Sequence, residues 1–90
     1  MNVTDQMKKL IQDEIAAEII EIIDQSADHA GHGADGGHFT ALIVSEKFRG
    51  LGLVQRHQLV YKAIAPVKEA VHAFSMRTHT PEEWSNQTKD

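Results

Sequence analysis

Histidine is the side chain of this sequence best suited to chemistry. Three of the six histidines, His29, His32 and His38, lie within residues 28–38, which also hold four glycines and no large apolar residue. Neutral imidazole is a good ligand for zinc, iron or copper, and glycine lets a loop fold around a metal at little steric cost. The spacing matches no zinc-finger or metalloprotease pattern. The three histidines are therefore either metal ligands or solvated loop residues.

His72 joins this set through the expected topology. It lies at the start of residues 71–78, which we expect to form a strand parallel to the strand that follows the histidine-rich stretch. Because parallel strands begin at the same edge of a sheet, His72 shares that edge with the histidine-rich stretch, and His79 belongs to the opposite end. His72 alone is equally consistent with a hydrogen-bonded strand histidine. The histidines that converge in this topology are His29, His32, His38 and His72.

The sequence offers little for catalysis. It contains no cysteine, so it has no thiolate or disulfide, and any sulfur ligand to a metal must come from a partner. No nucleophile-elbow context surrounds its serines, and Gly50-Leu-Gly52 is too short for a phosphate or dinucleotide fingerprint. Glu82 and Glu83 are better explained as helix-capping residues. We therefore expect a protein that is not an enzyme.

The charge disfavours non-specific nucleic-acid binding. The formal net charge is −4 with neutral histidines, whereas such binding needs a dense basic surface. Four basic residues nevertheless cluster around the glycine turn and the helix that follows it, and they keep a nucleic-acid interpretation open: Lys47, Arg49, Arg56 and Lys62.

Apolar periodicity predicts the first elements. A helix capped by Thr4 should bury a face made of Val3, Met7, Leu10, Ile11 and Ile15. The β-branched run 18–24 predicts a strand, and the alternation from Phe39 predicts a second strand that ends near residues 45–46. These two strands should form an antiparallel hairpin around the loop 28–38.

The remaining elements complete one domain over residues 1–90. A central helix extends to Ile64, and the strand 71–78 follows. Between them, Pro66 marks either a break or the first turn of a short second helical piece through Val67 to Ala70. Thr80-Pro-Glu-Glu83 predicts a capping box for a last helix anchored by Trp84, with a frayed tail at 85–90. The order α-β-β-α-β-α predicts an α+β fold with helices packed on a three-stranded mixed sheet. No apolar run approaches the roughly 20 residues of a membrane span, and we expect a cytoplasmic protein.

The central helix carries a histidine on its predicted apolar face. Val54, His57, Val60, Tyr61 and Ile64 recur at three- and four-residue steps. We interpret His57 as structural, while Arg56, Gln58 and Lys62 can point to water. His57 and Arg56 are also candidates for an interface.

Five short segments together resemble the BolA family. The resemblance extends from about Ile19 to Trp84, in the order and spacing of the family, and single segments are much less specific than the set. The segments are His38-Phe39, Val44-Ser-Glu-Lys-Phe-Arg-Gly50, Gln55-Arg-His-Gln-Leu-Val-Tyr61, Val71-His-Ala73 and Thr80-Pro-Glu-Glu-Trp84.

The resemblance implies a fold similar to the class II KH domain and an adaptor role. Proteins of this kind bind monothiol glutaredoxins with a CGFS motif and share a [2Fe-2S] cluster with them, in iron-sulfur assembly, trafficking or iron sensing. The glutaredoxin cysteine and glutathione supply sulfur, and the BolA-like chain supplies histidine. By motif the ligands fall on His29, with His32 as the alternative loop ligand, and on His72.

The resemblance also implies a second role, that of a transcriptional regulator that uses the glycine turn and central helix to contact DNA. In this sequence Lys47, Arg49, Arg56 and Lys62 would contact phosphates. A plain protein-interaction module without metal is a third possibility. The sequence leaves open whether the chain homodimerises and whether a cluster is delivered or sensed.

Overall fold

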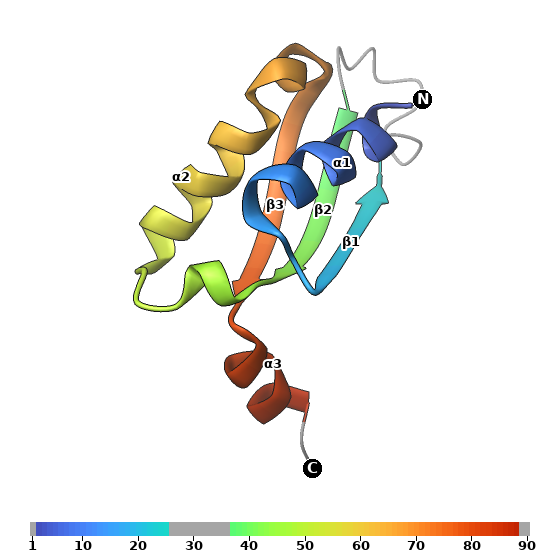
Figure 1. Cartoon of the computed structure of the whole chain (residues 1–90). Helices are drawn as coiled ribbons and strands as arrows, with labels where there is room; N and C mark the ends of the chain where they lie inside the picture. Colours follow the sequence, from blue (N-terminus) through green and yellow to red (C-terminus); the bar gives the residue numbers. More distant parts are fainter. Residues whose placement is uncertain (1, 26–36, 89–90) are drawn as a thin grey trace.

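A computed structural model describes residues 2–25 and 37–88 of the chain (Figure 1). The predicted order of helices and strands is confirmed. The short helical piece considered after Pro66 is a 3₁₀ helix, and a further 3₁₀ helix, which was not predicted, precedes the central helix. The elements are α1 (Val3–Ile15), β1 (Ile19–Asp24), β2 (Gly37–Val44), η2 (Glu46–Phe48), α2 (Leu53–Ile64), η3 (Ala65–Ala70), β3 (Val71–His79) and α3 (Pro81–Thr88).

The sheet has the predicted mixed topology. Its strand order is β1-β2-β3; β1 pairs antiparallel with β2, and β2 pairs parallel with β3. Helices α1 and α2 lie on one face of this sheet (Figure 1). Alternate residues of β2, Phe39, Ala41 and Ile43, are buried in the core between the sheet and these helices. Within the described residues, no helix is long and apolar enough to span a membrane.

Helix α1 begins slightly earlier than predicted. Asn2, and not Thr4, is the N-cap, because its Oδ1 accepts a hydrogen bond from the Asp5 N–H at 2.8 Å. The helix buries Met7, Ile11 and Ile15, which recur every four residues. The predicted apolar face is thus correct, although its outer members Val3 and Leu10 are only half-buried.

Ser45 joins the turn after β2 to two other elements. Its hydroxyl donates to the Ile15 carbonyl at 2.9 Å and accepts from the Lys47 N–H at 3.1 Å. Its own N–H donates to the His79 carbonyl at 2.9 Å. The buried serine therefore fixes the end of α1 and the end of β3 against the turn that leads into α2.

The apolar stripe predicted for α2 is correct only for Val60 and Ile64. Val60 and Ile64 are buried together with Ala63, whereas Val54 is 69 % exposed and Tyr61 is also exposed. The first turn of α2 lies beyond the core, so an apolar residue there meets solvent. His57, between the two parts, is half-buried.

Two further predictions need correction at the ends of elements. Gly37 and His38, expected in the loop 28–38, are the first residues of β2, and the rest of that loop lies outside the described residues. Helix α3 continues to Thr88, so residues 85–88 are helical and not a frayed tail. The hydroxyl of Thr88 donates to the Trp84 carbonyl at 3.0 Å and helps to satisfy the last turn.

Candidate functional site

Two histidines meet where β2 and β3 begin. The ring centroids of His38 and His72 are 5.2 Å apart, and the ring planes are tilted by 46°. The parallel pairing of the strands causes this proximity, as the sequence predicted. His72 is exposed and His38 is half-buried. His79 pairs with Val44 at the opposite end of the strands, also as predicted.

A β-bulge lies between these histidines. Gly37 pairs with Val71, but His38 pairs with Ala73, so β3 contributes one additional residue, His72, at this step. A bulge bends its strand and changes the direction of a side chain. His72, the additional residue, is exposed, whereas Phe74 and Met76 further along β3 pack against the core.

The described residues supply two imidazoles at this end of the sheet. Within residues 2–25 and 37–88, no group of three or more His, Cys, Asp or Glu side chains is close enough to hold a metal ion. The predicted ligand His29 and its alternative His32 lie outside the described residues. The pair could hold part of a metal group, and the other ligands would have to come from elsewhere.

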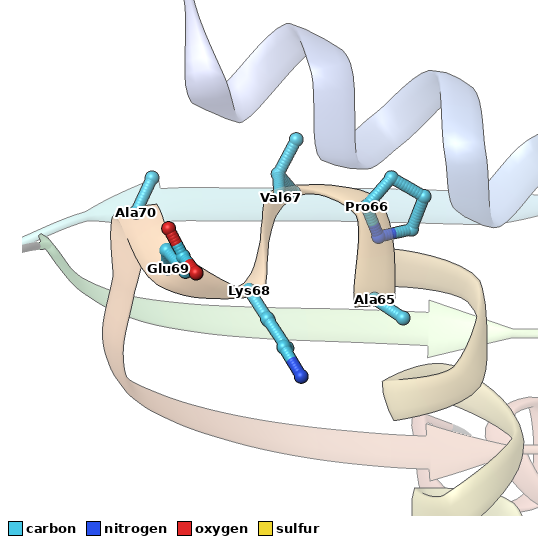
Figure 2. A pocket seen from close by; sticks show the side chains of 6 residues that line it. All are labelled: Ala65, Pro66, Val67, Lys68, Glu69 and Ala70. Carbon is cyan, nitrogen blue, oxygen red and sulfur yellow. The ribbon is translucent and has the colours of Figure 1, made fainter.

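The 3₁₀ helix η3 forms a shallow hollow next to the start of β3. Residues Ala65–Ala70 line this hollow of about 470 Å³, and Figure 2 shows Lys68 and Glu69 among small apolar side chains. Pro66 lacks a backbone N–H, and Val67 departs from helical geometry with φ −116°. The charged groups that line the hollow are one ammonium and one carboxylate.

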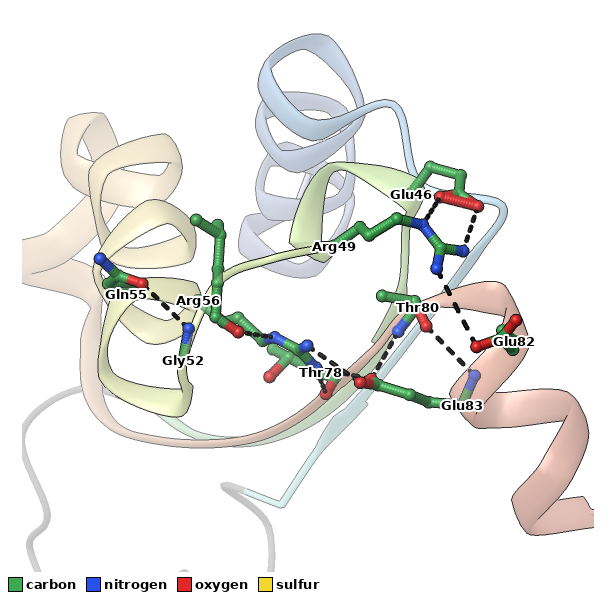
Figure 3. Close-up of polar contacts among 10 residues, drawn as sticks. Glu46, Arg49, Gly52, Gln55, Arg56, Thr78, Thr80, Glu82 and Glu83 are labelled. Carbon is green, nitrogen blue, oxygen red and sulfur yellow. Dashed lines mark hydrogen bonds and ion pairs between the residues drawn. The ribbon is translucent and has the colours of Figure 1, made fainter.

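Arg56 connects α2, β3 and α3, contrary to the prediction that it points to water (Figure 3). Its side chain is only 12 % exposed. Its Nε donates to the Leu51 carbonyl at 2.9 Å, and Nη1 donates to the Thr78 carbonyl at 3.2 Å. Nη1 and Nη2 also donate to the Glu83 carboxylate at 2.6 and 3.0 Å. Such a bidentate pair is strong and directional.

Glu83 is held in its ionised form by this arrangement. The hydrogen bonds from Arg56, followed by the bond from the Thr80 backbone N–H, lower the pKa of Glu83 to about 2. Thr80 and Glu83 form the predicted capping box, with bonds of 2.9 and 3.1 Å. The ion pair and the cap share one carboxylate, so together they fix α3 to the end of β3.

Three of the four predicted phosphate-binding residues already have partners in the chain. Arg49 donates to both carboxylate oxygens of Glu46, at 2.8 and 2.7 Å, which lowers the pKa of Glu46 (Figure 3). The Lys47 ammonium donates to the Glu14 carbonyl at 3.2 Å. Arg56 is bound as described above, and Lys62 is exposed. The cluster is therefore not a free basic surface.

Two other histidines are partly enclosed. Among the described residues, the buried Nε2 atoms of His57 and His79 have no hydrogen-bond partner. The His79 ring lies 5.7 Å from the Trp84 ring, and burial, followed by the Arg77 charge, lowers the pKa of His79. The sequence predicts Trp84 as the anchor of α3, but it does not predict His79 as the partner of Trp84, because the two residues share no sequence pattern.

Comparisons with known proteins agree on one family. The family model of BolA-like proteins matches residues 11–83. The mouse protein named BolA-like protein 2 is 33 % identical over 86 residues, which cover 96 % of this chain and 94 % of the relative. The Vibrio cholerae protein named DNA-binding transcriptional regulator BolA is 32 % identical over 89 residues, which cover 98 % and 84 % of the two chains. A crystal structure of a bol-like protein from Babesia bovis superimposes with a TM-score of 0.84 at 31 % identity, covering 99 % of this chain and 96 % of that one.

Proposed function

This chain belongs to the BolA-like family, and on that premise we propose that it is an adaptor for a monothiol glutaredoxin with a CGFS motif. In this proposal the two proteins form a heterodimer that shares a [2Fe-2S] cluster, and the complex serves iron-sulfur cluster assembly, trafficking or iron sensing. The chain acts by binding and presenting ligands and not as an enzyme.

The pair of imidazoles at the start of β2 and β3 carries this proposal. His72 is exposed and lies beside His38, with 5.2 Å between the ring centroids. Imidazole nitrogens replace thiolates on one iron in some [2Fe-2S] centres, where they raise the reduction potential. A chain with no cysteine suits a shared cluster, because the glutaredoxin cysteine and glutathione provide the sulfur.

In this proposal His72 is the ligand from β3, and His29 or its alternative His32 is the ligand from the segment before β2. His38 packs against the His72 ring. Such a neighbour restricts the orientation of the ligand ring, which is the usual role of groups around a metal ligand. The cluster, when bound, supplies electron-transfer and iron-transfer chemistry, and this chain supplies the position and orientation of the nitrogen donors.

The test is a titration of the chain into a [2Fe-2S]-loaded monothiol glutaredoxin, followed by visible absorption and circular dichroism. The variants are His72→Ala, His29→Ala and His32→Ala, with His79→Asn as the matched control at the opposite end of β3. Calorimetry on the same samples measures binding independently of the cluster. We expect the wild-type chain and the control to change the cluster spectrum, and His72→Ala to abolish the change.

The alternatives give different results in this experiment. If calorimetry detects binding but the cluster spectrum does not change, the chain is an interaction module that contributes no ligand to the cluster. An unchanged response in His72→Ala would refute its role as a ligand. An absence of binding to the glutaredoxin would refute the adaptor proposal itself.

A DNA-binding regulator is the second candidate, because the Vibrio cholerae relative carries that name. The internal contacts of Lys47, Arg49 and Arg56 disfavour it here, and Lys62 is the exposed member of the set. If duplex DNA binds, Lys62→Gln should reduce the salt dependence by about one released counterion, and Lys68→Gln on η3 is the control. No binding at low salt would remove this candidate.

A further inference from the structure

The two edges of the sheet differ in the side chains that contact them from the rest of the described chain. At the outer edge of β3, Tyr61 donates its hydroxyl hydrogen to the Phe74 carbonyl at 3.2 Å, and Arg56 donates to the Thr78 carbonyl at 3.2 Å. Both side chains come from α2, which runs beside β3 (Figure 1). Uncovered strand edges are templates for pairing with another chain, and covering them is a common protection. The β3 edge is protected in this way.

The β1 edge has no equivalent cover from the described part of the chain. β1 is the terminal strand, and its register with β2 is unbroken over six residue pairs. The Gln25 N–H donates to the His38 carbonyl at 2.7 Å. Because the backbone direction alternates in an antiparallel pair, the N–H and C=O groups of Ile20 and Ile22 point away from β2. They form a row of donors and acceptors along the outer edge.

The side chains along this edge are acidic and apolar. Glu18 and Glu21 are exposed, and Ile23 is 60 % exposed. Residues 18–24 contain no lysine, arginine or proline, which are the residues that commonly prevent an edge strand from pairing. The edge therefore repels an acidic strand and attracts a basic one.

We propose that β1 binds an extended, basic segment of a partner protein, which adds to the sheet as a fourth strand. Main-chain hydrogen bonds to the outer edge would supply affinity, and lysine or arginine side chains opposite the carboxylates would supply selectivity. A second copy of this chain is disfavoured as the occupant, because antiparallel pairing of two β1 strands would bring two sets of carboxylates together. The proposal does not depend on the glutaredoxin proposal, since it concerns a different part of the surface.

The test uses a blocked eight-residue peptide of lysine and valine with its lysines three residues apart, which matches the spacing of Glu18 and Glu21 on opposite faces of the strand; a glutamate–valine peptide of the same pattern and length is the control. Binding to the full chain is followed by fluorescence anisotropy at low ionic strength, and amide hydrogen exchange locates the contact. We expect only the lysine peptide to bind, and we expect slower exchange at the N–H groups of Ile20 and Ile22. Binding should weaken as salt is added.

Two double variants with the same change in net charge distinguish the effect of the carboxylates at the β1 edge from the effect of the overall charge. Glu18→Gln/Glu21→Gln should weaken peptide binding about fivefold, from cross-strand charge pairs of ordinary strength. Asp13→Asn/Glu69→Gln removes the same charge from α1 and η3 and should leave binding unchanged. Equal loss in both variants, protection outside β1, or no binding of the lysine peptide would overturn the proposal. A homodimer with protected β1 amides in the absence of peptide would overturn it in favour of a second copy.

Discussion

The pair formed by Arg56 and Glu83 should be the main link between α3 and the rest of the domain. We consider Arg56→Met, which keeps the aliphatic stem, Glu83→Gln, which keeps an acceptor for the Thr80 N–H, and the double variant. The three free energies of unfolding, with that of the wild type, form a double-mutant cycle. The cycle isolates the interaction between the two side chains from the other bonds that each one makes.

The contacts of the two residues set the expected magnitudes. Arg56→Met removes the donors to the Leu51 and Thr78 carbonyls and to Glu83. Because each of these hydrogen bonds contributes about 1 kcal/mol net, we expect the free energy of unfolding to fall by about 2–3 kcal/mol. The Glu83 side chain is 44 % exposed, so solvent screens its charge. We therefore expect Glu83→Gln to lower the free energy of unfolding by about 1 kcal/mol. We expect a coupling energy of about 1 kcal/mol.

Urea unfolding at neutral pH measures these values with two probes. Far-UV circular dichroism reports the whole domain, whereas fluorescence reports α3, because Trp84 is the only tryptophan in the sequence. In Arg56→Met we expect the fluorescence transition to occur at lower urea than the circular dichroism transition, since α3 loses its link to β3. Coincident transitions together with a coupling energy near zero would refute the reasoning.

The pH dependence gives an independent check on the same pair. The pKa of Glu83 is lowered to about 2 in the folded chain from an ordinary value of 4.5, so its contribution is present above pH 4.5 and is lost as the pH falls toward 2. The wild type should therefore be more stable than Glu83→Gln at pH 7, and the difference should be lost as the pH falls through about 2. A difference that is constant over this range would contradict the charge-based explanation.

Three further substitutions test single features by urea unfolding. Ser45→Ala leaves the buried Ile15 carbonyl without its 2.9 Å donor, and we expect a loss of about 1–2 kcal/mol; a neutral effect would refute the role of this bond. Gly50 has a φ of +81°, so Gly50→Ala should cost about 1 kcal/mol and Gly50→Asn less, because asparagine tolerates this conformation better; equal losses would contradict that explanation. Tyr61→Phe removes the 3.2 Å bond to the Phe74 carbonyl and should cost about 0.5 kcal/mol because the tyrosine is exposed; amide exchange in β3 unchanged from the wild type would argue against edge protection.

The sequence predicts most of the fold because its signals are local and repeated. The alternation around Phe39 and the four-residue period of Met7 and Ile11 predict elements that the structure contains. The crossover rule then makes β2 and β3 parallel. The ends of elements were less predictable, since Asn2 and Thr4 are both acceptable caps and only the geometry of the first turn selects one.

The candidate site was predictable to the extent that topology determines it. Parallel strands bring His38 and His72 to one end, and the structure confirms that they are neighbours. The bulge at His72 was not predictable, because one additional residue in a strand leaves the apolar pattern of its neighbours almost unchanged. The bond between Arg56 and Glu83 joins residues 27 positions apart, and no local pattern encodes such a contact.

The bond between Arg56 and Glu83 also provides a way to distinguish DNA binding from glutaredoxin binding. Arg56 cannot turn to a DNA phosphate without leaving the Glu83 carboxylate, to which it donates at 2.6 Å. Because this pair helps to hold α3, DNA binding through Arg56 should release α3 and change the emission of Trp84, whereas binding through Lys62 should not. A glutaredoxin that docks at His38 and His72, at the opposite end of β3 from Trp84, should leave the emission unchanged as well. Trp84 emission that changes with DNA, but not in Arg56→Met, would assign the contact to Arg56; emission that never changes would show that the arginine keeps its structural role in the complex.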